Sequence, residues 1–106
     1  MVREIAPAEF VARRERGEPL LLLDVREPWE LEIASVPGIV HIPMAKVPDR
    51  LGELDRATEI VVLCRSGGRS LQVARFLESQ GFGSVANLTG GILAWGRDVD
   101  PSLRAY

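Results

Sequence analysis

The apolar residues of this chain gather in short continuous runs, separated by stretches in which apolar positions recur every three or four residues. The clearest runs are residues 20–25, which hold four leucines in succession, and residues 60–63, which are rich in β-branched side chains. Such runs are typical of strands buried on both faces of a parallel sheet. Shorter candidate strands lie at residues 2–5, 39–42 and 84–88.

The segments between these runs carry helix signals. Pro7 and Pro28 suit the first turn of a helix, and Leu71, Ala74 and Leu77 fall on one helical face. We predict helices or helical turns at residues 7–14, 28–33, 44–54 and 70–80, and a last helical piece that begins at residues 92–95. Because strands alternate with helices along the chain, we predict an α/β domain with a mainly parallel central sheet.

Length and charge bound the function. The 106 residues predict one domain (residues 1–106), with a core at about 2–96 and a C-terminal tail at 97–106. Thirteen basic and fifteen acidic residues give a net charge of −2, which offers no electrostatic case for binding nucleic acid or an anionic membrane. The first residues lack the apolar stretch of a signal peptide, and no run of ~18 apolar residues exists. We therefore expect a cytoplasmic protein.

One stretch carries candidate chemistry. Residue 64, the only cysteine, follows the apolar run at 60–63, and the next residues contain two glycines and two arginines before a helix begins. In an open α/β sheet, ligands bind at the carboxyl ends of the strands. Glycines let backbone N–H groups turn toward one centre, while the start of a helix and the cations Arg65 and Arg69 favour an anion. These groups favour a nucleophilic Cys64 thiolate.

The numbers of cysteine and histidine residues exclude other chemistries. A single cysteine rules out an intramolecular disulfide, a resolving partner cysteine and a zinc cluster of cysteines. A single histidine, His41, rules out a histidine-rich metal site. We therefore expect no metal and no cofactor.

Four segments resemble the rhodanese family of sulfurtransferases, in particular its single-domain members. Residues 64–70, with the sequence Cys-Arg-Ser-Gly-Gly-Arg-Ser, resemble the active-site loop of that family. Residues 22–30 resemble its N-terminal signature, residues 37–38 with 42–43 its central segment, and residues 88–95 its C-terminal signature. The four segments occur in the family's order, and the resemblance covers roughly residues 2–96. One departure is Ala34-Ser35, where the family commonly has a Gly-His pair; we expect no effect on the sulfur chemistry.

The resemblance implies a rhodanese-like domain with a five-stranded sheet flanked by helices. It implies that Cys64 is the catalytic residue and accepts a sulfane sulfur as a persulfide, with thiosulfate as the usual test donor. An acceptor, cyanide in the assay or a thiol in the cell, then takes this sulfur. The implied substrate-binding residues are Arg65, Ser66, Gly67, Gly68, Arg69 and Ser70. The implied partners are a small anionic sulfur donor and a protein sulfur donor or acceptor.

Three alternatives stay open. The first is a sulfur carrier or interaction module in a relay with a protein donor, which would use the same Cys64 chemistry. The second is a phosphatase or arsenate reductase, although cysteine phosphatases have a loop one residue longer than the four residues between Cys64 and Arg69. The third is a catalytically silent domain used for interaction, but such domains usually lose the cysteine.

Several other residues receive an interpretation. We expect Asp24 to hold an arginine or loop donor and Arg26 to line the pocket mouth, with a structural ion pair or solvation of the strand end as the alternative. We expect a structural role for His41. Among the remaining candidates, we expect Trp29 and Trp95 to be core or pocket-wall residues, and Glu27, Glu30 and Glu32 to form a solvated face.

Overall fold

Five parallel strands form the centre of the molecule. The computed structural model describes residues 1–106, and its strands are β1 (Arg3–Ile5), β2 (Leu20–Asp24), β3 (Ile39–His41), β4 (Glu59–Leu63) and β5 (Val85–Leu88). They lie in the order β1-β5-β4-β2-β3, and every neighbouring pair is parallel. The predicted α/β class and five-stranded parallel sheet are confirmed, and each strand begins and ends within one residue of its predicted bounds.

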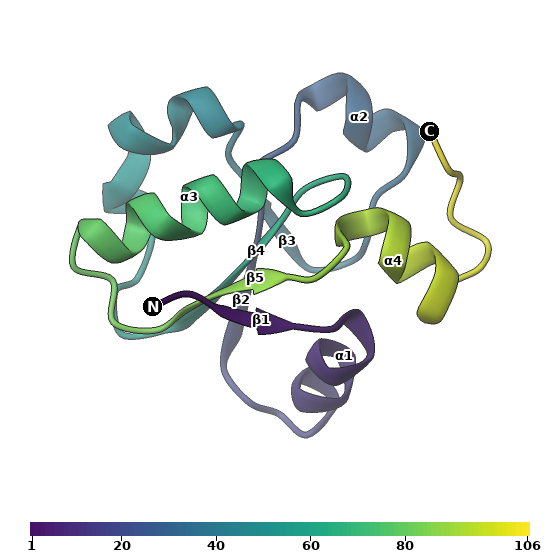
Figure 1. The fold of residues 1–106 in the computed structure, drawn as a ribbon, viewed down its shortest axis with the longest axis horizontal. Coiled ribbons are helices and arrows are strands. Elements are labelled where there is room, and N and C mark those ends of the chain that lie inside the picture. The colour runs from purple at the N-terminus through teal and green to yellow at the C-terminus, as the bar shows by residue number, and fades with distance from the viewer.

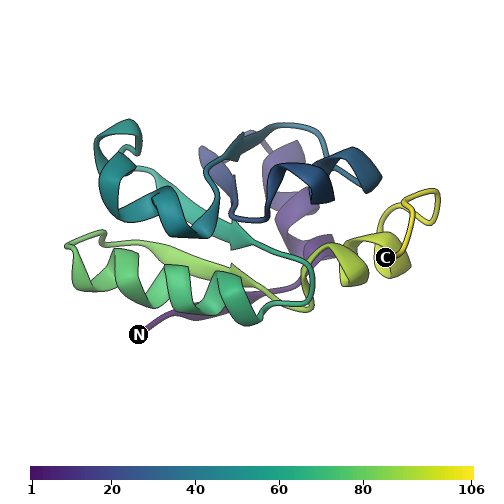
Figure 2. The same cartoon turned by 90° about the horizontal axis from the view of Figure 1, so that it is seen from above.

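Helical segments cover both faces of this sheet, which gives three layers (Figures 1 and 2). The segments are α1 (Pro7–Glu15), α2 (Pro28–Ile33), the 3₁₀ segment η1 (Met44–Glu53), α3 (Gly68–Ser79) and α4 (Gly91–Asp98). α3 and η1 pack together on one face, and α1 and α4 pack together on the other. None of these helices has the length and apolar character needed to cross a bilayer.

The central strand β4 shows why the apolar runs are continuous. Ile60, Val62 and Cys64 pack into the cluster under α3 and η1, while Val61 and Leu63 pack into the cluster next to α1 and α4. All five side chains are buried, because successive residues of a strand point to opposite faces and helices cover both. The same alternation aims the Cys64 side chain at α3.

Two helix boundaries differ from the prediction by more than one residue, and both differences concern the site. α3 begins at Gly68 rather than residue 70, because Gly67 at its N-cap adopts a φ of 109°, which lets the chain enter the helix two residues earlier. α4 continues to Asp98, where the Val99 N–H closes the helix by donating to the Trp95 carbonyl at 2.9 Å. The tail beyond it folds back on the domain, because Leu103 and Tyr106 pack against the core cluster next to α1 and α4. In Figure 1 the yellow tail leaves α4 and ends beside α2.

Candidate active site

The candidate nucleophile Cys64 lies at the carboxyl end of β4, between β2 and β5 in the centre of the sheet. Its side chain is 1% exposed. Three groups surround the sulfur. The backbone N–H groups of Gly67 and Ser70 donate to Sγ at 3.1 Å and 3.3 Å, and Sγ donates to the Ser70 hydroxyl at 3.2 Å. Two N–H groups at the start of a helix, aimed at one sulfur, favour negative charge on it or on an atom bonded to it.

The loop is held in this shape from the other side by the start of α4. The N–H groups of Ile92 and Leu93 donate to the carbonyl oxygens of Cys64 and Arg65 at 2.9 Å and 3.1 Å. Gly91, with a φ of 61°, allows this close approach, because a Cβ built there would lie 2.5 Å from both carbonyl oxygens. The N–H groups at the start of α4, which have no partner within the helix, thus hold the first two residues of the loop, Cys64 and Arg65, in place.

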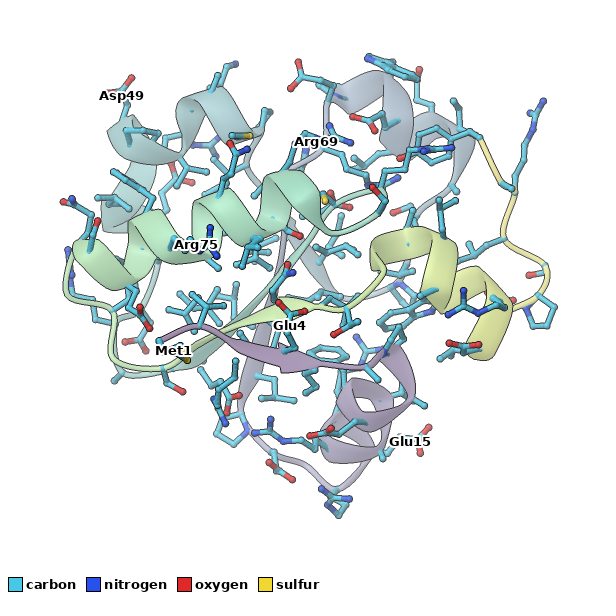
Figure 3. The ribbon with its side chains drawn as sticks, in the orientation of Figure 1. Met1, Glu4, Glu15, Asp49, Arg69 and Arg75 are labelled. Carbon is cyan, nitrogen blue, oxygen red and sulfur yellow. The ribbon has the colours of Figure 1, made fainter.

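A polar chain beneath the loop was not predicted from the sequence. The Ser70 hydroxyl donates to the Asn87 side-chain oxygen, and the Asn87 amide donates to the Gly67 carbonyl at 3.2 Å. The same amide group also donates to the Glu4 carboxylate at 3.2 Å. Figure 3 shows Glu4 on β1, the neighbour of β5. The available signal was a lone asparagine within an otherwise apolar strand, since a buried amide requires partners.

The second loop arginine is paired rather than free. The two terminal nitrogens of Arg69 donate to the two oxygens of Glu30 at 2.7 Å and 2.8 Å, and Glu30 is 2% exposed. Arg69 lies between the start of α3 and α2 (Figure 3). The prediction that Glu30 belongs to a solvated face is wrong, because Glu30 also accepts the backbone N–H of Glu27 in a capping box and so points inward from α2.

This pair makes stability depend on pH. The Arg69 hydrogen bonds lower the pKa of Glu30 to about 2, although burial acts in the opposite direction. A carboxyl whose pKa is lowered by folding stabilises the protein above its unfolded pKa, and this contribution is lost as pH falls toward the folded pKa. Glu30→Gln should therefore cost about 2 kcal/mol of unfolding free energy at neutral pH and almost nothing near about pH 2. Urea unfolding of both proteins across this pH range measures the difference in unfolding free energy. A difference that is the same at neutral pH and at the acid end would contradict the prediction.

Asp24 and Arg26 form a closed ion pair behind the loop. The Asp24 carboxylate accepts from Arg26 Nη2 at 2.7 Å, and both side chains have no exposed surface. This is the structural ion pair expected as the alternative, and Arg26 does not line a pocket mouth, because its guanidinium is enclosed by its partners. His41 Nε2 lies 2.6 Å from the Arg26 carbonyl oxygen, which is a structural position.

Arg65 and Trp29 bring the C-terminal tail into the site. The Arg65 guanidinium donates to the main-chain oxygen of Tyr106 and lies 5.3 Å from the centre of its ring. Trp29 meets the same ring edge-on at 6.2 Å and is 59% exposed, so of the two roles expected for it, core or pocket wall, the structure excludes the core. Trp95 is buried in the core, as predicted.

The remaining loop residues form the open side of the site. Ser66 and Gly68 are exposed, whereas Arg65 and Arg69 are half-buried. Ala34 of the Ala34-Ser35 departure packs into the core cluster beside α1 and α4, while Ser35 is exposed. The arrangement is a buried cysteine sulfur, the candidate nucleophile, with backbone N–H donors directed at it, as stabilisation of one added anionic atom would require.

Comparison with known proteins agrees with this geometry. The family model of the rhodanese-like domain matches residues 6–98. A sulfurtransferase of Allochromatium vinosum is 40% identical over 97 residues, which cover 92% of this chain and 91% of that protein. A chloroplast protein of Arabidopsis thaliana with rhodanese-like and PpiC domains is 51% identical over 89 residues, or 80% of this chain, and this chain spans only 30% of its length.

A second bacterial relative and a solved structure extend the comparison. A Bacillus subtilis protein named as a sulfur carrier is 42% identical over 94 residues, covering 89% of this chain and 51% of that protein. The crystal structure of a rhodanese-like domain protein from Staphylococcus aureus superposes with a TM-score of 0.86 at 28% identity, covering 99% of each chain.

Proposed function

Because the chain belongs to the rhodanese-like domain family, we propose that it is a sulfurtransferase that carries sulfane sulfur as a persulfide on Cys64. The observation that supports this most strongly is the convergence of the Gly67 and Ser70 N–H groups on Cys64 Sγ. Both N–H groups lie at the start of α3 and donate to the same sulfur atom. They would hold the terminal sulfur of a persulfide as its charge develops.

The reaction has two steps. The Cys64 thiolate attacks the outer sulfur of thiosulfate, the sulfur–sulfur bond of the donor breaks, and sulfite leaves with the electron pair. Cyanide or a thiolate then attacks the terminal sulfur of the persulfide, and Cys64 leaves as a thiolate that the same N–H groups stabilise. No electrons are gained or lost by the protein over the cycle, so the chemistry requires no cofactor.

A steady-state assay tests the proposal. Thiocyanate formation from thiosulfate and cyanide should follow ping-pong kinetics, with parallel double-reciprocal lines, because sulfite leaves before cyanide binds. Intersecting lines would mean that both substrates bind together, and no thiocyanate with any sulfur donor would refute the proposal.

A sulfur carrier in a relay is the second candidate, favoured by the Bacillus subtilis relative that is named as a carrier. The chemistry at Cys64 is shared, so kinetics must separate the two. A carrier should turn over thiosulfate poorly and exchange persulfide quickly with a protein donor such as a cysteine desulfurase. An enzyme should turn over repeatedly with a small-molecule donor and acceptor, whether the donor is thiosulfate or cysteine persulfide, and should need no protein donor.

The pairing of Arg69 weighs against a phosphatase or arsenate reductase. Such a loop needs its arginine free to grip an oxyanion with two hydrogen bonds, but both terminal nitrogens of Arg69 already bind Glu30. The four-residue spacing between Cys64 and Arg69 points the same way.

A further inference from the structure

The tail that follows α4 ends at the site, and its last residue touches three charged groups there. The Tyr106 hydroxyl accepts a hydrogen bond from Arg26 at 3.0 Å and donates one to Glu30 at 2.9 Å. Its main-chain oxygen accepts from Arg65, and its ring lies against the Arg65 guanidinium. Tyr106 is thus anchored by its hydroxyl to buried partners while its main chain engages a loop residue.

The tail is held along its length as well. The Asp100 N–H donates to the Trp95 carbonyl, and the Leu103 N–H donates to the Asp100 carbonyl at 3.1 Å. Leu103 packs against the core cluster beside α1 and α4. The position of Tyr106 over Arg65 is therefore set by the fold of the segment and by the two hydroxyl contacts together.

These contacts engage both arginines of the loop. The two terminal nitrogens of Arg69 donate to Glu30, while the Arg65 guanidinium donates to the main-chain oxygen of Tyr106 and lies against its ring. The groups that remain to receive a donor at Cys64 are backbone N–H groups. A dianion such as thiosulfate loses much hydration on entering the site and needs a charged partner to replace it. A persulfide carries at most one negative charge on the sulfur that is transferred. It therefore loses less hydration than thiosulfate on entering the site and has less need of a charged partner there.

We propose that Tyr106 determines donor specificity: by occupying Arg65, it disfavours thiosulfate and favours persulfide donors of low charge. This inference rests on the proposed function. In the favoured reaction the Cys64 thiolate attacks the outer sulfur of R–S–SH, the donor's sulfur–sulfur bond breaks, and R–S⁻ leaves with the electron pair. The proton stays on the transferred sulfur. The exposed ring of Trp29, in edge contact with Tyr106, offers an apolar surface to the organic part of such a donor.

The test compares single-turnover rates of sulfur addition to Cys64 with thiosulfate and with cysteine persulfide, followed by intact mass. Tyr106→Ala removes the anchor and frees Arg65, so the thiosulfate rate should rise about tenfold, the value of one charge-assisted hydrogen bond. The cysteine persulfide rate should change less than about twofold. Arg104→Ala, an exposed neighbour in the same segment, is the matched control and should change neither rate.

A double-mutant cycle assigns the effect to Arg65. In the wild type, Arg65→Gln should lower the thiosulfate rate less than about twofold, because the guanidinium is already engaged; in Tyr106→Ala it should remove the whole gain. The wild-type comparison also serves if Tyr106→Ala fails to fold. A tenfold loss on Arg65→Gln alone, or an equal change for both donors in Tyr106→Ala, overturns the inference and leaves the proposed function standing. If neither donor adds sulfur to the wild type, both fail.

Discussion

Replacing Cys64 with serine is expected to abolish sulfur transfer and leave the fold in place. Serine fills nearly the same volume in the buried site, but its hydroxyl does not ionise near neutral pH and cannot accept sulfane sulfur. Thiocyanate formation should fall by a factor on the order of 10³ or more. The assay is the same one that tests ping-pong kinetics, run with thiosulfate and with cysteine persulfide as donor.

Ser70→Ala is the matched control for this substitution. It removes the hydroxyl next to Cys64 Sγ but keeps the Ser70 N–H that donates to the sulfur, so activity should fall far less than in Cys64→Ser. Thermal unfolding of both variants reports whether the fold survives. If Cys64→Ser keeps more than about a tenth of the activity with either donor, the nucleophile is not Cys64.

Gly91→Ala should disrupt the site although it leaves Cys64, the candidate nucleophile, unchanged. The added Cβ would lie 2.5 Å from the carbonyl oxygens of Cys64 and Arg65, and the φ of 61° is one that an L side chain rarely adopts. α4 and the loop must therefore separate, which breaks the hydrogen bonds from Ile92 and Leu93 to those carbonyls. We expect a loss of about 3 kcal/mol in unfolding free energy, measured by urea unfolding, together with a drop of about tenfold or more in sulfur transfer.

Gly83→Ala separates this effect from the general cost of replacing a glycine. A Cβ at Gly83 meets nothing within 4 Å, and its φ lies outside the left-handed region, so both stability and activity should stay near those of the wild type. Equal behaviour of the two variants would show that the contact between α4 and the loop does not shape the site.

Local patterns predicted the fold and the centre of the site because the information is contiguous. The apolar run of β4, the candidate nucleophile Cys64 and the glycines of the turn, Gly67 and Gly68, follow one another within one short stretch. The predicted strand bounds agree with the structure for the same reason. A strand that is buried on both faces has a continuous apolar sequence, which ends where the strand meets a loop. The start of α3 was missed because whether Gly67 begins the helix depends on a backbone angle that composition leaves free.

The partners of the loop could not be predicted, because they are distant in the chain. Glu30 pairs with Arg69 across 39 residues, and Tyr106 reaches Glu30 across 76. A sequence shows the charge of each residue but not which opposite charge the fold brings to it. The two loop arginines were therefore expected to act as free cations. In the structure Arg69 is paired with Glu30, and Arg65 is in contact with Tyr106. The loop relies on backbone donors more than on charged side chains.

The intact mass of the protein after incubation with a sulfur donor tests the central claim most directly. Wild-type protein treated with thiosulfate or cysteine persulfide and then freed of the donor should gain the mass of one sulfur atom. The gain should disappear on addition of cyanide and should be absent in Cys64→Ser. A wild-type protein that gains no sulfur from either donor, or a Cys64→Ser variant that gains it equally, would contradict the assignment of Cys64 as the sulfur carrier.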